Sequence, residues 1–279
     1  MANFRDLVES VVDRLPWGLR KLARRFASFV DVHGFSALFV SKPTFRGVYS
    51  SFTDVHGSVD LVKHELASAS VTNLTSVRSD VATGLPLLDQ HRELLPATVA
   101  LLATRRHPLT ILDFGGAAGI DFRILLNALP SADVTYCVVD LPEVCEKARP
   151  LWSGESRISF QSALPEQATF DLVYSWSAIH YVSEPLNLLR RFTQYRPLAI
   201  LIVGSPFTSG KAFVREQLNR SKPFPQWVLS LPEVRDLFAS CGYRLALHAV
   251  HEHDYNVDGY PTEYRVPNST SLLFLSNDR

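Results

Sequence analysis

The hydrophobic pattern of the chain changes character near Pro108. Before this residue, apolar positions recur at helical spacing within residues 1–30 and again over residues 85–104. After it, short apolar runs bounded by turn residues alternate with amphipathic segments. That alternation is typical of strands joined by helices in a parallel, doubly wound sheet. The pattern therefore predicts an N-terminal helical cap and lid over residues 1–107 and an α/β domain over residues 108–279.

The α/β part is expected to contain a mostly parallel sheet of seven strands with a hairpin-like pair at its end. The strands are expected at 110–114, 133–139, 157–161, 170–175, 198–203, 243–250 and 271–276. Helices are expected at 120–129, 142–150, 184–194 and, in several segments, 211–240, with Gly242 as the last C-cap. Residues 41–60 contain two glycines and many polar residues, so they are expected to be loop-like, with aromatic side chains that form a lid.

The most informative segment is TILDFGGAAGIDF, residues 110–122. It reads as a buried strand, a glycine turn and the first turn of a helix. A turn with few side chains lets backbone N–H groups approach a ligand, and the positive end of the next helix points toward it. In open α/β sheets, ligands bind at this carboxyl end of the strands. The segment therefore predicts a ligand site, and a tight turn that binds nothing is the alternative.

The spacing of the turn separates two classes of nucleotide site. The dinucleotide pattern needs glycine at its first, third and sixth positions, which here hold Gly115, Ala117 and Ile120. Asp140 follows at the end of the second predicted strand, where a carboxylate can accept both hydroxyls of a ribose. An aspartate that only begins a helix is the alternative. Asp140 suits either class of site, so the turn spacing and the strand number must decide between them. Both disfavour the dinucleotide.

The glycine turn resembles the acid-x-Gly-x-Gly-x-Gly motif that opens the class I S-adenosylmethionine (SAM) methyltransferases. Here it reads DFGGAAG from Asp113 to Gly119, with Ala117 in place of the middle glycine. The DFGG form, FVREQ after the fifth strand and Gly-Tyr before the sixth resemble a little-characterised branch of these enzymes. The class I resemblance covers residues 108–279. It implies a Rossmann-like fold, SAM as cofactor and methyl transfer as the reaction.

The same resemblance implies a cofactor site at the turn and the neighbouring strand ends. Its residues would be Asp113, Gly115, Gly116, Ala117, Gly119, Asp140, Leu141, Gln161, Ser162, Ser175 and Trp176. Many family members carry an acid where this chain has Gln161 and Ser162, whose amide and hydroxyl can still bond to adenine. The SWSA sequence after the fourth strand differs from the Asn/Asp-Pro-Pro-Tyr of adenine and glutamine N-methyltransferases. That difference argues against DNA adenine as the acceptor.

Residues near the expected position of the methyl acceptor are candidates for catalysis and substrate binding. Histidine titrates close to neutral pH, so His180 is the first candidate for a general base and Tyr181 the second, with a structural histidine as the alternative. Acceptor contacts are expected from Tyr49, Phe52, His251, His253 and Tyr255. A metal site at His248, His251, His253 and Asp254 is disfavoured, because His248 and His251 lie on opposite faces of a continued strand. No metal is expected.

Composition and charge limit the partners and the cellular location that we expect for the protein. The 279 residues balance 28 lysines and arginines against 28 aspartates and glutamates, so no general attraction to nucleic acid is expected. Three cysteines without CxxC spacing argue against a disulfide framework. The first residues lack a signal-peptide pattern, and no apolar run is long enough to span a membrane. We expect a cytoplasmic protein without stable membrane insertion, and a homodimer formed through the basic, amphipathic N-terminal helices.

Together these inferences predict a SAM-dependent methyltransferase that acts on a small organic acceptor, with oxygen or nitrogen ahead of carbon as the methylated atom. Alignment of nucleophile, methyl carbon and sulfur would supply most of the catalysis, with general-base help from His180. Two alternatives remain open. One is a methyltransferase fold that binds a partner without catalysing, and the other is an NAD-dependent oxidoreductase.

Overall fold

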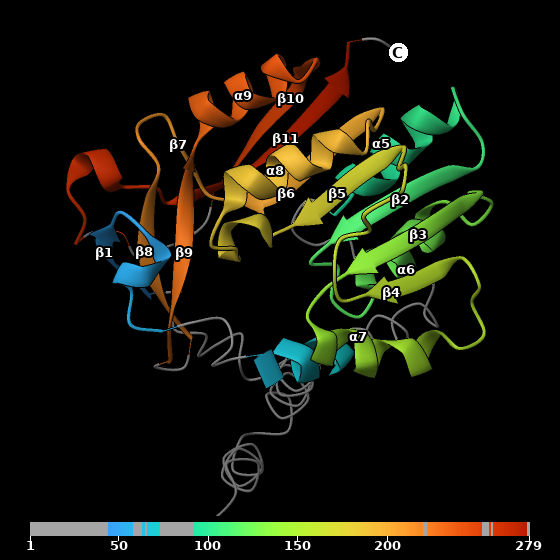
Figure 1. Ribbon diagram of the computed structural model, residues 1–279, viewed down its shortest axis with the longest axis horizontal. Coiled ribbons are helices and arrows are strands. Elements are labelled where there is room, and N and C mark those ends of the chain that lie inside the picture. The colour runs from blue at the N-terminus through green and yellow to red at the C-terminus, as the bar shows by residue number, and fades with distance from the viewer. Residues whose placement is uncertain are drawn as a thin grey trace, which may run out of the picture. The chain divides into compact units, whose positions relative to one another are not determined.

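The computed structural model describes residues 44–57, 63–64, 66–72, 92–219, 222–252, 257 and 259–277 (Figure 1). Thr44–Arg279 forms one compact unit. The predicted N-terminal helices, and the homodimer through them, lie outside the described residues. The predicted domain boundary at residues 107 and 108 also stays a prediction.

The main sheet has seven strands in the order β10-β11-β6-β5-β2-β3-β4. Its strands are β2 (Leu109–Phe114), β3 (Val134–Val139), β4 (Ile158–Gln161), β5 (Leu172–Trp176), β6 (Ala199–Ser205), β10 (Tyr243–Glu252) and β11 (Asn268–Ser276). The strands from β4 to β6 pair in parallel, whereas β11 is antiparallel to both β6 and β10. This topology confirms the predicted Rossmann-like, mostly parallel sheet and the hairpin at its end.

Helices cover both faces of the main sheet (Figure 1). The helices are α5 (Leu94–Ala103), α6 (Ile120–Ala128), α7 (Pro142–Ala148), α8 (Pro185–Gln194) and α9 (Leu231–Ser240). Successive side chains of a strand point to opposite faces, so Ile111 packs in the cluster with α5, α6 and α7, and Leu112 packs in the cluster with α8 and α9. Strands buried on both faces explain the continuous apolar runs in the sequence.

A second, four-stranded sheet corrects two of the sequence predictions. Its order is β1-β8-β9-β7, formed by β1 (Thr44–Tyr49), β7 (Phe207–Thr208), β8 (Phe213–Asn219) and β9 (Lys222–Ser230). The loop expected at 41–60 therefore contains a strand, and the helices expected over 211–240 begin only at Leu231. We call this sheet the cap sheet.

Prolines explain why β9 is not a helix. Pro223 and Pro225 would each remove a hydrogen bond from a helix interior and clash with the preceding turn. In the cap sheet, β7 pairs only with Leu229 and Ser230, so both prolines lie where β9 has β8 as its single neighbour. These prolines were the signal in the sequence against a helix.

Local chemistry marks the ends of the remaining helical segments. Short 3-10 turns occur at Phe52–Asp54, Arg149–Trp152, Ile179–Tyr181 (η4) and Thr262–Tyr264. The Ser230 hydroxyl accepts the Glu233 N–H and caps α9, and Gly242 follows α9 with φ +84°, as the predicted C-cap requires.

None of the helices in the described ranges combines the length and hydropathy needed to cross a membrane.

Candidate functional site

The glycine turn joins β2 to α6 through a backbone that only small residues can follow. Gly115 has φ +74°, and a Cβ there would meet the Cβ of Ala178. A Cβ on Gly116 would meet the carboxylate of Asp113. Ala117 also has a positive φ, +53°, so the alanine that departs from the family motif takes the left-handed conformation. Glycine is therefore required at two consecutive positions for steric reasons, independent of any ligand.

The side chain of Asp113 packs against this turn at Gly116. Its side chain is fully buried, and the Tyr136 hydroxyl donates to Oδ2 at 2.8 Å. Oδ1 has no hydrogen-bond partner among the described residues. Burial, reinforced by the charge of nearby Asp121, raises the pKa of Asp113 well above its usual value. The structure thus places Asp113 at the predicted strand end, with its carboxyl group buried beneath the turn.

Asp140 binds the glycine turn directly. Oδ2 accepts the Ala117 N–H at 2.8 Å and Oδ1 accepts the Leu141 N–H at 2.7 Å. Burial raises the pKa of Asp140, and these two backbone bonds oppose the rise. Each oxygen keeps a further lone pair, because a carboxylate has about four acceptor positions. The carboxylate can therefore hold the turn and still accept two hydroxyl groups.

The next strand end continues the same edge of the sheet. The Gln161 carbonyl, at the end of β4, accepts the Asp140 N–H at 3.1 Å. The side chains of Gln161 and Ser162 are exposed. The structure thus brings the turn, Asp140 with Leu141, and Gln161 with Ser162 onto three adjacent strands, β2, β3 and β4.

On the other side of β2, the end of β5 contributes the predicted pair Ser175 and Trp176. Arg92, which precedes α5 and was not predicted, contacts this end. The buried Ser175 hydroxyl donates to the Phe114 carbonyl at 2.9 Å and joins β5 to β2. Arg92 lies 3.9 Å from the ring centroid of Trp176, and its Nη1 donates to Asp121 Oδ1 at 2.7 Å. Asp121 is buried in the first turn of α6. A buried acid needs a cationic partner, and this requirement was the signal in the sequence that could have pointed to Arg92.

His180 lies in η4, just beyond β5, and its imidazole is buried. Its Nδ1 is 3.1 Å from Ser205 Oγ at the end of β6. Burial, followed by the charge of Arg215, lowers the pKa of His180 to about 3. The ring is therefore neutral at pH 7, and the imidazolium that a general base must become is disfavoured. The general-base role of His180 stays a prediction, and its lowered pKa weighs against it.

Tyr181 connects the cofactor edge with the cap sheet. Its hydroxyl donates to Gln217 Oε1 at 2.7 Å and accepts from Gln226 Nε2 at 3.2 Å. Gln226 Oε1 accepts from Arg215 Nε at 2.7 Å, which fixes the orientation of that amide. Arg215 is fully buried and lies 3.6 Å from the centroid of the Phe45 ring. This network was not among the predictions from the sequence, because residues 211–240 were expected to be helical.

The structure places the described residues among those predicted to bind the acceptor in different surroundings, each with its own contacts. The Tyr49 hydroxyl is 3.5 Å from Glu216 Oε2, and Phe52 stacks on Trp227 with centroids 6.0 Å apart. His251 is buried, with Nε2 2.7 Å from Ser271 Oγ. His253 and Tyr255 lie outside the described residues. Within the described ranges, no three His, Cys, Asp or Glu side chains form a group suited to a metal.

Comparison with known proteins agrees with this geometry. Residues 88–243 match a family model described as a methyltransferase domain. No curated protein matches the chain. The structure resembles 1,6-didemethyltoxoflavin-N1-methyltransferase of Burkholderia thailandensis, solved with 1,6-didemethyltoxoflavin and S-adenosylhomocysteine (18% identity, 85% of this chain, 100% of that chain, TM-score 0.50). It also resembles magnesium protoporphyrin IX methyltransferase of Synechocystis PCC 6803, solved with S-adenosylhomocysteine (13%, 78%, 100%, TM-score 0.48).

The fold and the turn define a class I, Rossmann-like methyltransferase. Because the family model matches more than half of the chain, the chain belongs to the methyltransferase-domain family. It is a SAM-dependent methyltransferase.

Proposed function

We propose that this enzyme methylates oxygen or nitrogen of a small organic acceptor. The observation that carries the cofactor part of the proposal is the carboxylate of Asp140, which accepts the Ala117 N–H of the glycine turn at the carboxyl edge of the sheet. The acceptor part rests on the polar contact between the cap sheet and Tyr181. When bound, SAM supplies a methyl group already activated by its sulfonium. The chain then needs chiefly to hold donor and acceptor in line. The finer resemblance to the branch with the DFGG turn is part of this proposal.

The residues at the edge fit the parts of SAM. The backbone of Gly115–Gly119 would face the amino-acid end, and Asp140 would accept the ribose hydroxyls. The exposed side chains of Gln161 and Ser162, with Leu141 beside them, would border the adenine. Ser175 and Trp176 would border the methyl-transfer end. Support comes from their positions on adjacent strands of one sheet edge.

Arg92 would bind the cofactor carboxylate. Its side chain is 13% exposed, and of its five N–H donors only Nη1 makes a hydrogen bond, to Asp121, within the described part of the chain. Its guanidinium is held in place by the Trp176 face on one side and by this ion pair. A preorganised guanidinium with donors to spare suits a carboxylate, which it can bind in a bidentate manner.

The cap sheet would bound the acceptor. Gln217 accepts a hydrogen bond from the Tyr181 hydroxyl and Gln226 donates one to it, so the cap sheet lies beside η4, directly after β5. Amide, phenol and guanidinium groups dominate this contact, which suits a polar organic molecule. His180 would assist by position and by its neutral ring nitrogen, because burial disfavours the charged form. Once an acceptor is known, wild-type turnover in His180→Phe would exclude even this role.

The test is calorimetric binding of S-adenosylhomocysteine and of 5′-methylthioadenosine, which lacks the amino-acid end. We expect wild-type protein to bind S-adenosylhomocysteine and not NAD. Asp140→Asn should weaken both nucleosides roughly tenfold or more, the loss for charge-assisted hydrogen bonds. Arg92→Gln should weaken S-adenosylhomocysteine by a similar factor and leave methylthioadenosine unchanged.

Glu146→Gln, an exposed position on α7, is the matched control for loss of a charge. Equal loss of both ligands in Arg92→Gln would show that Arg92 acts through the fold and not through the carboxylate. Full binding in Asp140→Asn would refute the proposed ribose contact.

A further inference from the structure

One amide of the cap sheet has hydrogen-bond donors to spare. Gln217 lies on β8, where its Oε1 accepts the Tyr181 hydroxyl at 2.7 Å and Gln226 Nε2 at 3.0 Å. Neither N–H of its Nε2 donates a hydrogen bond within the described part of the chain. Phe45 on β1 and Phe224 on β9 lie opposite it, and both are buried. The partly exposed Gln217 therefore presents two donors between apolar neighbours.

The orientation of this amide is fixed by Arg215, two residues earlier on the same strand. A guanidinium group can only donate hydrogen bonds, so the Gln226 atom 2.7 Å from Arg215 Nε is Oε1. Gln226 then turns Nε2 toward Gln217, and the Gln217 atom that faces it is Oε1. Arg215 and Gln226 are both buried. The network therefore has one arrangement, in which the Gln217 N–H groups point away from it.

The same network favours a negative charge at Gln217. Its hydrogen bonds run in one direction from Arg215 through Gln226 to Gln217, and bonds in such a chain polarise one another. The charge of Arg215 reaches η4, because it adds to burial in lowering the pKa of His180. Glu216 points to the other face of β8 and pairs with Arg46 at 2.6 Å. The exposed donors of Gln217 thus suit an anionic oxygen.

We propose that Gln217 selects methyl acceptors that carry a carboxylate, by donating a hydrogen bond from Nε2 to a carboxylate oxygen. Arg215 and Gln226 are positioning residues that hold the amide in the orientation for this bond. The inference rests on the proposed function, because it names the chemical class of the acceptor that the cap sheet would bound.

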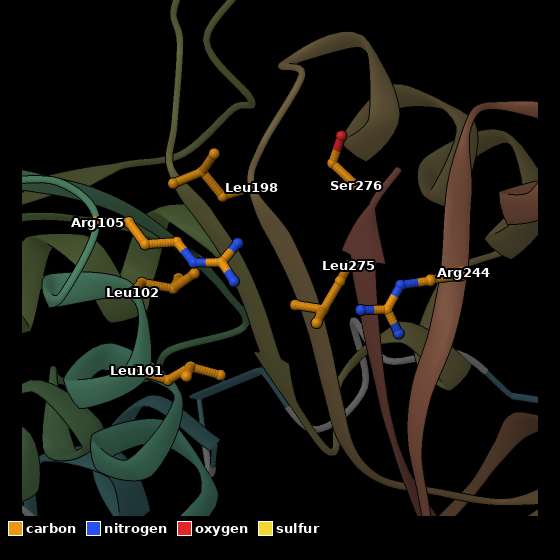
Figure 2. Close-up of a pocket in the computed structure, with 7 residues that line it drawn as sticks. All are labelled: Leu101, Leu102, Arg105, Leu198, Arg244, Leu275 and Ser276. Carbon is orange, nitrogen blue, oxygen red and sulfur yellow. The ribbon is translucent and has the colours of Figure 1, made fainter. Parts of the chain in front are cut away.

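A second basic place on the protein needs a control. Arg105 and Arg244 line a hollow at the amino edge of the main sheet, opposite the edge that carries the glycine turn (Figure 2). The space there is about 30 Å³, which suits water and is far below the roughly 300 Å³ at which small-molecule sites begin. Arg244 is exposed, so Arg244→Gln should not affect binding of the acceptor.

NMR of side-chain amides in the S-adenosylhomocysteine complex tests the proposal at neutral pH and constant ionic strength. The probes are benzoate, benzyl alcohol and benzylamine, which share one ring and carry an anionic, a neutral and a cationic head group. We expect benzoate to bind roughly tenfold or more tightly than benzyl alcohol, and benzylamine to bind most weakly. Benzoate alone should shift the Gln217 amide signals, which are identified by their loss in Gln217→Met.

Gln217→Met removes the donors without adding a charge, so it should abolish the preference for benzoate. Gln194→Met, at an exposed position on α8, is the matched control and should keep the preference, as should Arg244→Gln. Equal affinity of the wild-type protein for benzoate and benzyl alcohol, absence of benzoate binding, or a preference that survives Gln217→Met would overturn the inference. Loss of the preference in Arg244→Gln would also overturn it.

The affinity for S-adenosylhomocysteine is measured first for each protein. Wild-type affinity in Gln217→Met shows that the fold and the cofactor site are intact. A wild-type protein that binds S-adenosylhomocysteine without preferring benzoate overturns this inference alone. A wild-type protein that does not bind S-adenosylhomocysteine overturns the proposed function, and this inference with it.

Discussion

The cofactor edge and the cap sheet are both polar regions of one compact unit, but they are built from contacts of different range. At the cofactor edge, Asp140 reaches Ala117, 23 residues away, through one strand–turn–helix unit. In the cap sheet, Arg46 pairs with Glu216, 170 residues away, at 2.6 Å. The first region follows from a local motif, whereas the second exists only when distant segments meet. We expect the two regions to respond differently to substitution.

The largest expected effect is in the cap sheet. Arg215→Met keeps the length of the side chain but removes the donors to Gln226 and to the Val266 carbonyl. Breaking a buried polar network of this kind costs about 3–5 kcal/mol of unfolding free energy. Denaturant unfolding measures the loss of stability. Calorimetry should find the affinity for S-adenosylhomocysteine within about twofold of wild type, a much smaller change than the roughly tenfold loss expected when one hydrogen bond to the ligand is removed. A parallel loss of affinity would show that the two regions act as one.

The second effect is at the cofactor edge. In Gly116→Ala the new Cβ meets the buried Asp113 carboxylate, so the turn must shift. Overpacking of this kind costs about 1–3 kcal/mol, and the shifted turn should also lose S-adenosylhomocysteine binding. Gly154→Ala is the matched control, because its Cβ would meet nothing within 4 Å. Retained affinity in Gly116→Ala would mean that the turn geometry does not govern cofactor binding.

The third effect is the pH dependence of stability, and it concerns His180, which lies between the two regions. Its folded pKa, about 3, is below the ordinary value of 6.5. Between these values the unfolded chain binds a proton that the folded chain does not. His180 therefore destabilises the fold progressively as pH falls below about 6.5, by roughly 1.4 kcal/mol per pH unit, and has no such effect above it.

His180→Gln should remove this contribution while keeping a polar contact to Ser205. We expect its unfolding free energy to fall less steeply than that of wild type between pH 6 and pH 4. Identical slopes for the two proteins would show that His180 titrates normally in the folded state.

The smallest effect concerns Tyr260, which packs against Phe45 beside the cap sheet. Its hydroxyl oxygen is buried without a hydrogen-bond partner in the described structure, and burial raises its pKa to about 12. Tyr260→Phe should leave the unfolding free energy unchanged or raise it by up to about 1 kcal/mol. Tyr136→Phe at the cofactor edge should lower it by about 1–3 kcal/mol, because its hydroxyl donates to buried Asp113. A destabilised Tyr260→Phe would reveal a partner for that hydroxyl.

The strands and the cofactor edge were predictable because their signals are local. Apolar runs of fixed period marked β2 to β6, and the turn residues marked the edge where a ligand binds. Arg92 was not predictable, because its role depends on Asp121 and Trp176, which meet it only in the folded chain. Of the helical segments expected over 211–240, only α9 at Leu231–Ser240 is confirmed. The part before it was wrong, because Pro223 and Pro225 exclude a helix there.

By itself, the sequence determined the doubly wound sheet, the glycine turn and the placement of Asp140, since each follows from side-chain period and turn chemistry over a few tens of residues. Only the tertiary structure decided the surroundings of His180 and Tyr181. The sequence placed both after β5, but the low pKa of His180 results from burial beside Arg215, and the Tyr181 bonds run to β8 and β9. Burial and long-range strand pairing belong to the whole fold, so no local pattern of residues encodes them.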